Sequence, residues 1–299
     1  MSRKYFLFSG LTLMLLVGIF DLVTAIYYLT RMSSLSDNSE LIFAFVIAII
    51  NTGLCIPSLV LTIKATKNKS NSLVASVLLI IASTLYFGYR IFSVARLSQS
   101  AFASGQSYQM TMYWMTYMLG QVLIGLLPVG LAIFSLVTFK KNEQDYVLSQ
   151  KINKIFYYIV LALVFQAFIS YSTTGIRGSI VANSSSMESL IQTLIYLIGS
   201  LGLIGLATPS FILSFFEKKK DVSRNLMLIA ALLMLGIHTW SLIISFQQAS
   251  EYNIGTLTEL VAIESVGVIA EFIVLIASAI LMFVKFKSKE PEQIKTELE

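Results

Sequence analysis

Residues 5–29 read YFLFSGLTLMLLVGIFDLVTAIYYL and contain a single charged side chain, Asp21. A helix needs about 20 mostly apolar residues to cross the hydrocarbon core of a membrane, which is about 30 Å thick. A segment that crosses lipid in one run must be helical, because a helix satisfies its own backbone hydrogen bonds. The run continues past Asp21 to Tyr28 without an A-x-A pattern. We therefore expect a retained first transmembrane span rather than a cleaved signal peptide.

Seven further stretches of the same kind follow along the chain: 41–63, 72–95, 113–139, 155–171, 190–216, 225–246 and 260–284. Of the 299 residues, 56% are hydrophobic and 12% are charged. Soluble globular proteins carry about 25% charged residues, and disordered chains carry more charge and less apolar content. This composition excludes both classes. The sequence therefore predicts an all-α, polytopic integral membrane protein with eight transmembrane helices.

Lys and Arg residues gather in alternate connecting segments. Arg31, Arg96 and Arg177 lie in the other set of connections. Short loops rich in Lys and Arg stay on the cytoplasmic side, so the pattern predicts a cell-membrane protein with both termini cytoplasmic and an even number of spans. The net charge of +5 thus reflects the membrane topology, and the basic side chains can contact anionic lipid headgroups. Their pattern does not indicate nucleic-acid binding. The basic set is Arg3, Lys4, Lys64, Lys67, Lys69, Lys140, Lys141, Lys151, Lys154, Lys218, Lys219, Lys220, Arg224, Lys285, Lys287, Lys289 and Lys295.

A ten-residue segment occurs twice at an offset of 152 residues. Residues 53–62 read GLCIPSLVLT and residues 205–214 read GLATPSFILS, with Gly, Leu, Pro, Ser and Leu identical. Pro57 and Pro209 lie at the same point of the second and sixth spans, where each is a candidate helix kink, as is Pro128 in the fourth span. We interpret the chain as a tandem pair of four-helix units, 1–145 and 146–299, in a parallel repeat. Chance similarity between apolar segments is the alternative.

Two ionisable side chains lie at similar depth in the first unit. Asp21 falls in the outer half of the first span and Arg90 in the third. An unpaired charge in a membrane span costs about 3 kcal/mol on insertion scales, so we expect the two to pair. Gln166, placed opposite Asp21 in the repeat alignment, is a candidate neutral partner. The group is a candidate polar site, and the alternative is a structural ion pair that fixes helix register.

The second unit carries a candidate proton-exchange group. Glu271 falls near the middle of the eighth span, and Glu264 lies one heptad before it on the same helix face. His238 lies in the seventh span, and Gln121 takes a similar place in the fourth. A carboxyl beside an imidazole can take up and release a proton, as proton-coupled transport requires. The alternative is that Glu271 and His238 link two helices as a hydrogen-bonded pair.

Motifs for soluble-enzyme chemistry are missing from the sequence. It contains no G-x-x-x-x-G-K-[ST] loop, no H-E-x-x-H pair and no G-x-S-x-G elbow. One Cys and one His are too few for cysteine-based or histidine-based metal clusters. We therefore expect neither an enzyme nor a cofactor or metal site.

Two functions fit these features. The first is a transporter or permease component that uses intramembrane polar groups, with a separate ATPase as partner if ATP drives it. The second is a non-transporting accessory or structural protein that binds other membrane proteins. Solvent access to Glu271 distinguishes them, because a transport path needs water at that depth.

Overall fold

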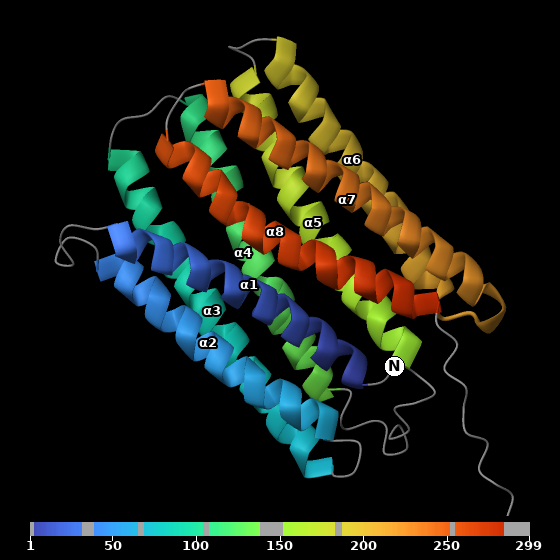
Figure 1. The fold of residues 1–299 in the computed structure, drawn as a ribbon. Coiled ribbons are helices and arrows are strands. Elements are labelled where there is room, and N and C mark those ends of the chain that lie inside the picture. Colours follow the sequence, from blue (N-terminus) through green and yellow to red (C-terminus); the bar gives the residue numbers. More distant parts are fainter. Residues whose placement is uncertain are drawn as a thin grey trace, which may run out of the picture.

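The computed structural model describes residues 3–31, 39–64, 69–103, 108–137, 152–182, 187–251 and 255–283 (Figure 1). Within these ranges the chain forms eight long helices, each long and apolar enough to cross a membrane. The prediction of an all-helical, multi-pass protein with eight spanning helices is confirmed at this level. The helices are α1 (Arg3–Arg31), α2 (Ser39–Lys64), α3 (Lys69–Ala103), α4 (Tyr108–Val137), α5 (Ile152–Ala182), α6 (Met187–Leu213), α7 (Lys220–Glu251) and α8 (Gly255–Phe283), with a short 3₁₀ turn, η2 (Glu217–Lys219), before α7.

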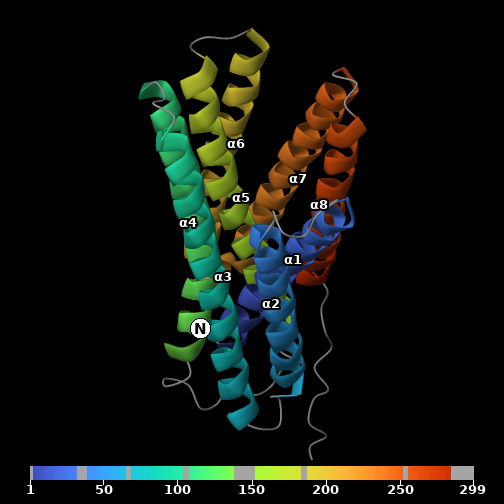
Figure 2. The same cartoon turned by 90° about the vertical axis from the view of Figure 1, so that its left-hand side faces the viewer.

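The two halves of the bundle share one order of neighbours. In the first half, α1 packs on α2, α2 on α3, α3 on α4, and α4 returns to α1. Helices α5 to α8 repeat this order, and α8 returns to α5. The halves meet where α1 packs on α5, α4 on α5, and α1 on α8. Figure 2 shows α7 and α8 diverging from α4, α5 and α6 toward the end at which α4 begins.

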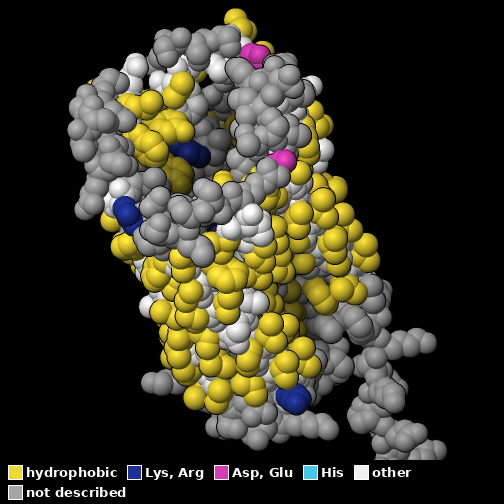
Figure 3. Space-filling model, turned by 60° about the vertical axis from the view of Figure 1, so that its left-hand side comes forward, with side chains coloured by type: hydrophobic (Ala, Val, Ile, Leu, Met, Phe, Trp, Pro, Cys, Tyr) yellow, Lys and Arg dark blue, Asp and Glu magenta, His cyan; other side chains and the backbone are white. Residues whose placement is uncertain are grey.

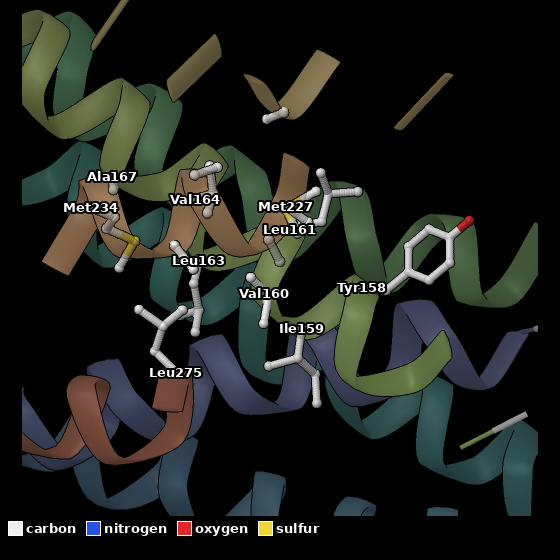
Figure 4. Packing of buried hydrophobic residues seen from close by; sticks show 14 of the residues in the cluster. Tyr158, Ile159, Val160, Leu161, Leu163, Val164, Ala167, Met227, Met234 and Leu275 are labelled. Atoms are coloured by element: carbon white, nitrogen blue, oxygen red, sulfur yellow. The ribbon is translucent and has the colours of Figure 1, made fainter. Parts of the chain in front are cut away.

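Helix α5 lies at the centre of the bundle. Its residues 157–164 are buried at every position, so this segment faces other helices on all sides. Leu163 and Val164 belong to one apolar cluster with Met234 of α7 and Leu275 of α8 (Figure 4). A smaller cluster in the first half joins α1, α2, α3 and α4.

The two ends of the bundle differ in charge. The described part of the chain places Lys4, Lys64, Lys154, the 218–220 lysines and Arg224 at the end where α1 begins and α8 ends. We call this the basic end. Arg90, Arg96 and Arg177 lie toward the opposite end, where α1 ends and α8 begins.

The two similar segments have similar surroundings. Residues 53–62 and 205–214 follow the same order of exposed and buried positions except at their last residue. Ser58 donates a hydrogen bond of 2.8 Å to the carbonyl of Ala75 on α3. Ser210 donates one of 2.6 Å to the carbonyl of Ser223 on α7. Each serine therefore ties its helix to the next helix in the chain.

The three candidate kink residues lie inside continuous helices. Helix α2 runs through Pro57, α4 through Pro128 and α6 through Pro209. Pro57 and Pro209 are exposed on the surface of the bundle, whereas Pro128 is buried. Pro57 and Pro209 therefore face outward from the bundle rather than toward a neighbouring helix.

Candidate functional site

The first polar cluster joins α1, α3 and α4 around Arg90. Its guanidinium donates from Nη1 to Oε1 of Gln121 at 2.7 Å and from Nε to the hydroxyl of Tyr86 at 2.6 Å. Its Nη2 lies 3.9 Å from Oδ1 of Asp21. The expected pairing of Asp21 with Arg90 is therefore present in the structure, and Gln121 joins it.

Close packing between helices holds this cluster in place. Gly125 of α4 is buried, and a Cβ atom added there would lie 2.9 Å from the ring of Phe87 and 3.7 Å from Cβ of Arg90. Only a glycine lets α4 come this close to the α3 turn that carries Arg90. Tyr86 lies one turn before Arg90 on the same helix face and is almost fully buried.

The second polar cluster joins α5, α7 and α8 around His238. Nδ1 of His238 lies 3.7 Å from Oε2 of Glu271, a distance longer than a hydrogen bond. The imidazole also packs edge-on against the Tyr171 ring at 5.2 Å and lies 5.8 Å from the Phe272 ring. Within the described part of the chain, His238 Nδ1 and the Tyr171 hydroxyl are buried and have no hydrogen-bond partner. The cluster thus holds polar atoms whose hydrogen-bonding capacity is unused by the surrounding helices.

Two further contacts lie toward the end of the bundle opposite the basic end. Arg177 of α5 stacks over Tyr113 and Tyr117 of α4, with its Cζ 5.6 Å and 5.2 Å from the two ring centres. Tyr27 of α1 donates a 2.7 Å hydrogen bond to Glu259 of α8. Arg96 and Arg177 were expected in connecting segments, but Arg96 lies within α3, which runs on to Ala103, and Arg177 within α5, which runs on to Ala182.

The four paired ionisable side chains are incompletely buried. The exposed fractions of the side chains are 21% for Asp21 and 23% for Arg90, and 17% for both His238 and Glu271. Figure 3 shows a hollow at the end opposite the basic end, in which apolar side chains and a Lys or Arg side chain are visible. Asp21, Arg90 and His238 lie in the half of the bundle next to this end, and Glu271 lies near the middle of α8.

The structure does not bring two of the predicted residues into these clusters. Gln166 of α5 is half-buried and forms no hydrogen bond with either cluster among the described residues. An offset of 152 from Asp21 falls on Thr173, seven residues after Gln166. Glu264 belongs to α8, but its side chain lies outside the described residues.

Tyr86 and Tyr171 are the functional candidates that sequence reasoning missed. Both are neutral, and the chain contains 14 tyrosines, so composition does not single them out. The spacing of Tyr86 four residues before Arg90 is the one signal that points to it.

The described ranges contain no group of three His, Cys, Asp or Glu side chains that could hold a metal ion. Cys55, the one cysteine, is buried in α2. No protein family, no curated protein and no solved structure matches this chain.

Proposed function

We propose that this chain is a multi-pass membrane transporter or permease component, and that its substrate path begins in the hollow shown in Figure 3. The observation that carries the proposal is the exposed fraction of the four ionisable side chains, which is 17% to 23% although all four lie within spans. Exposing a charge to hydrocarbon is costly. A water-accessible space beside both clusters removes that cost.

The orientation follows from the charge difference between the two ends. Because Lys and Arg favour the cytoplasmic side, the basic end is cytoplasmic and both termini lie there. The hollow then opens on the outer face of the cell membrane. A path from this hollow leads past Arg90 and Asp21 on one side and His238 and Glu271 on the other.

The two clusters supply different chemistry to such a path. Arg90 and Gln121 offer donors and an amide to a polar or anionic group, with Asp21 as the counter-charge. Glu271 and His238 can take up and release a proton, and this couples movement of a substrate to a proton gradient. If ATP supplies the energy instead, a separate ATPase binds at the basic end. We propose no enzymatic reaction for the chain, because its sequence contains none of the nucleotide-loop, zinc-pair or serine-elbow motifs.

We further propose that the chain is a tandem parallel repeat of units 1–145 and 146–299. Three observations support this: the shared order of helix neighbours, the matching burial of the two similar segments, and the equivalent hydrogen bonds of Ser58 and Ser210. An axis along the membrane normal would map α1 onto α5, and would exchange the α4–α5 contact with the α1–α8 contact. Rocking of two such halves is a common way to open a path alternately to each side.

Cysteine labelling tests the proposed path. The chain contains one cysteine, so Cys55→Ala gives a cysteine-free background, with the residue that stands at the matching position of the second segment. Single cysteines at Gln121 and His238 should react with a membrane-impermeant thiol reagent added from outside. A cysteine at Ile273, an exposed residue of α8 between the clusters and the basic end, is the control and should stay unlabelled, because lipid excludes the reagent. Absence of labelling at both polar positions in a folded protein would contradict the transport path.

The accessory function is the second candidate, favoured by one observation. Gly53 and Gly205 are exposed, and a Cβ atom added at either would meet open space. Small exposed residues let another transmembrane helix pack closely. Under this function the polar positions stay unlabelled, while Gly53→Leu and Gly205→Leu abolish co-purification with a partner membrane protein.

A further inference from the structure

An apolar groove runs along the seam between α7 and α8 and has a volume of about 290 Å³. All of its lining residues are apolar. Leu232, Ile276 and Ile280 are among the exposed residues, so the groove opens on the outer surface of the bundle. Its lining residues are Leu228, Ala231, Leu232, Leu235, Leu275, Ile276, Ala279, Ile280 and Phe283.

The groove occupies one leaflet of the membrane. On α7 its lining extends from Leu228 to Leu235, which is about 10 Å along the helix axis. Half of the hydrocarbon core is about 15 Å thick. The groove is therefore long enough for part of an acyl chain, and it is too short to seat a helix that crosses the whole membrane.

A cationic side chain lies at the end of the groove nearest the basic end. Arg224 lies one turn before Leu228 on α7, and its Cζ lies 5.4 Å from the ring centre of Phe283, a lining residue. Its Nη2 pairs with Asp221, which is exposed. Its Nε is buried and has no hydrogen-bond partner within the described ranges. Lys218 and Lys219 lie exposed in the connection just before α7.

We propose that this groove binds one anionic phospholipid, with an acyl chain between α7 and α8 and the phosphate group at Arg224. Burial of the acyl chain against apolar side chains contributes affinity for any phospholipid. The guanidinium hydrogen-bonds the phosphate oxygens, and Lys218 and Lys219 add attraction for a headgroup that carries net negative charge. The headgroup charge thus gives preference for an anionic lipid over a zwitterionic one. This inference is independent of the proposed transport function.

Native mass spectrometry of the full chain in detergent tests the proposal. Phosphatidylglycerol or phosphatidylcholine with identical acyl chains is added at equal concentration, and the occupancy of the bound lipid is measured. We expect phosphatidylglycerol to be retained preferentially. Arg224→Gln should lower its affinity about tenfold, because charge-assisted hydrogen bonds are lost. Arg224→Lys should keep most of the preference.

Two further variants distinguish lipid binding in the groove from general attraction to basic side chains elsewhere on the protein. Ala279→Trp fills the groove and should remove retention of both lipids, whereas Lys64→Gln, at the exposed basic end of α2, should change neither. A thermal melt of each variant checks that it is folded. Equal retention of the two lipids by the unmodified chain would overturn the proposal, and so would unchanged phosphatidylglycerol occupancy in folded Arg224→Gln and Ala279→Trp.

Discussion

Arg90 shows how one residue can organise three helices inside a membrane. Its planar guanidinium presents donors in fixed directions, and these reach Tyr86 on its own helix, Gln121 on α4 and Asp21 on α1. A lysine in its place would offer a single point charge and would not hold these partners in one plane. One side chain therefore links α1, α3 and α4 at this depth.

His238 offers a direct probe of the second cluster, because it is the only histidine of the chain. A carboxylate near Nδ1 favours the tautomer with a proton on that nitrogen. We predict that Glu271→Gln shifts the ¹⁵N resonances of histidine-labelled protein as this preference is lost. Asp21→Asn, in the other cluster, is the control and should leave the signal in place. Unmoved resonances in Glu271→Gln would show that the carboxylate and imidazole do not interact.

The pairing of the ionisable side chains was predictable from the sequence, but their neutral partners were not. Asp21 and Arg90 lie at similar depth in the first and third spans, and Glu271 and His238 lie near the middle of the eighth and seventh spans. The cost of an unpaired ionisable group in a span makes such pairing a safe expectation. Tyr86 and Tyr171 carry no charge, so depth gives no reason to choose them. Gln166 was proposed from the repeat alignment, yet the offset of 152 from Asp21 falls on Thr173, seven residues further along.

At the scale of elements, α5 extends beyond its predicted span of 155–171 to Ala182. The added turns, residues 172–182, are rich in Ser, Thr and Gly and lie beyond the apolar stretch from which the span was predicted. Their hydroxyls bond back within the helix: Ser172 donates to the Phe168 carbonyl at 2.6 Å and Thr173 to the Ile169 carbonyl at 2.9 Å. This internal bonding lets polar residues continue a helix that composition alone would end.

The contact between α4 and α5 gives a stability prediction. A Cβ atom added at Gly120 would lie 2.9 Å from Cγ2 and Oγ1 of Thr173, whereas one added at Gly130 would meet open space. Gly120→Ala should therefore destabilise the protein by about 1–3 kcal/mol through overpacking. Gly130→Ala is the matched control and should be neutral or stabilising, because Ala favours helix by up to about 1 kcal/mol.

Thermal unfolding in one detergent measures both glycine variants. The prediction is a lower melting temperature for Gly120→Ala, and an unchanged or higher one for Gly130→Ala, relative to the unmodified chain. If Gly120→Ala melts at or above the temperature of Gly130→Ala, α4 and α5 are not in close contact at this point.

At the scale of the whole molecule, the number of helices was predictable and their packing was not. Hydropathy counts spans because lipid demands apolar residues on every exposed face. In a membrane, however, side chains that face lipid and side chains that face protein are equally apolar. Residues 157–164 of α5 therefore look like any other span in the sequence, although they are buried on all sides.

The proposed orientation predicts which side of the membrane each end faces. In the Cys55→Ala background, Tyr108→Cys at the start of α4 should react with an impermeant thiol reagent in intact cells. Lys64→Cys at the end of α2 should react only after the cells are permeabilised, because it lies at the basic end. The reverse pattern would place the basic end outside and would invert the proposed topology.

The central place of α5 also constrains the order in which the protein can assemble during synthesis. The ribosome delivers helices in chain order, so α1 to α4 enter the bilayer while the helix that α1 and α4 pack against is still being translated. Until then, lipid must fill the position that α5 later takes. The first half therefore reaches its final packing only when the nascent chain has produced the second half. If translation stops between the two halves, α1 and α4 lack the helix against which they pack.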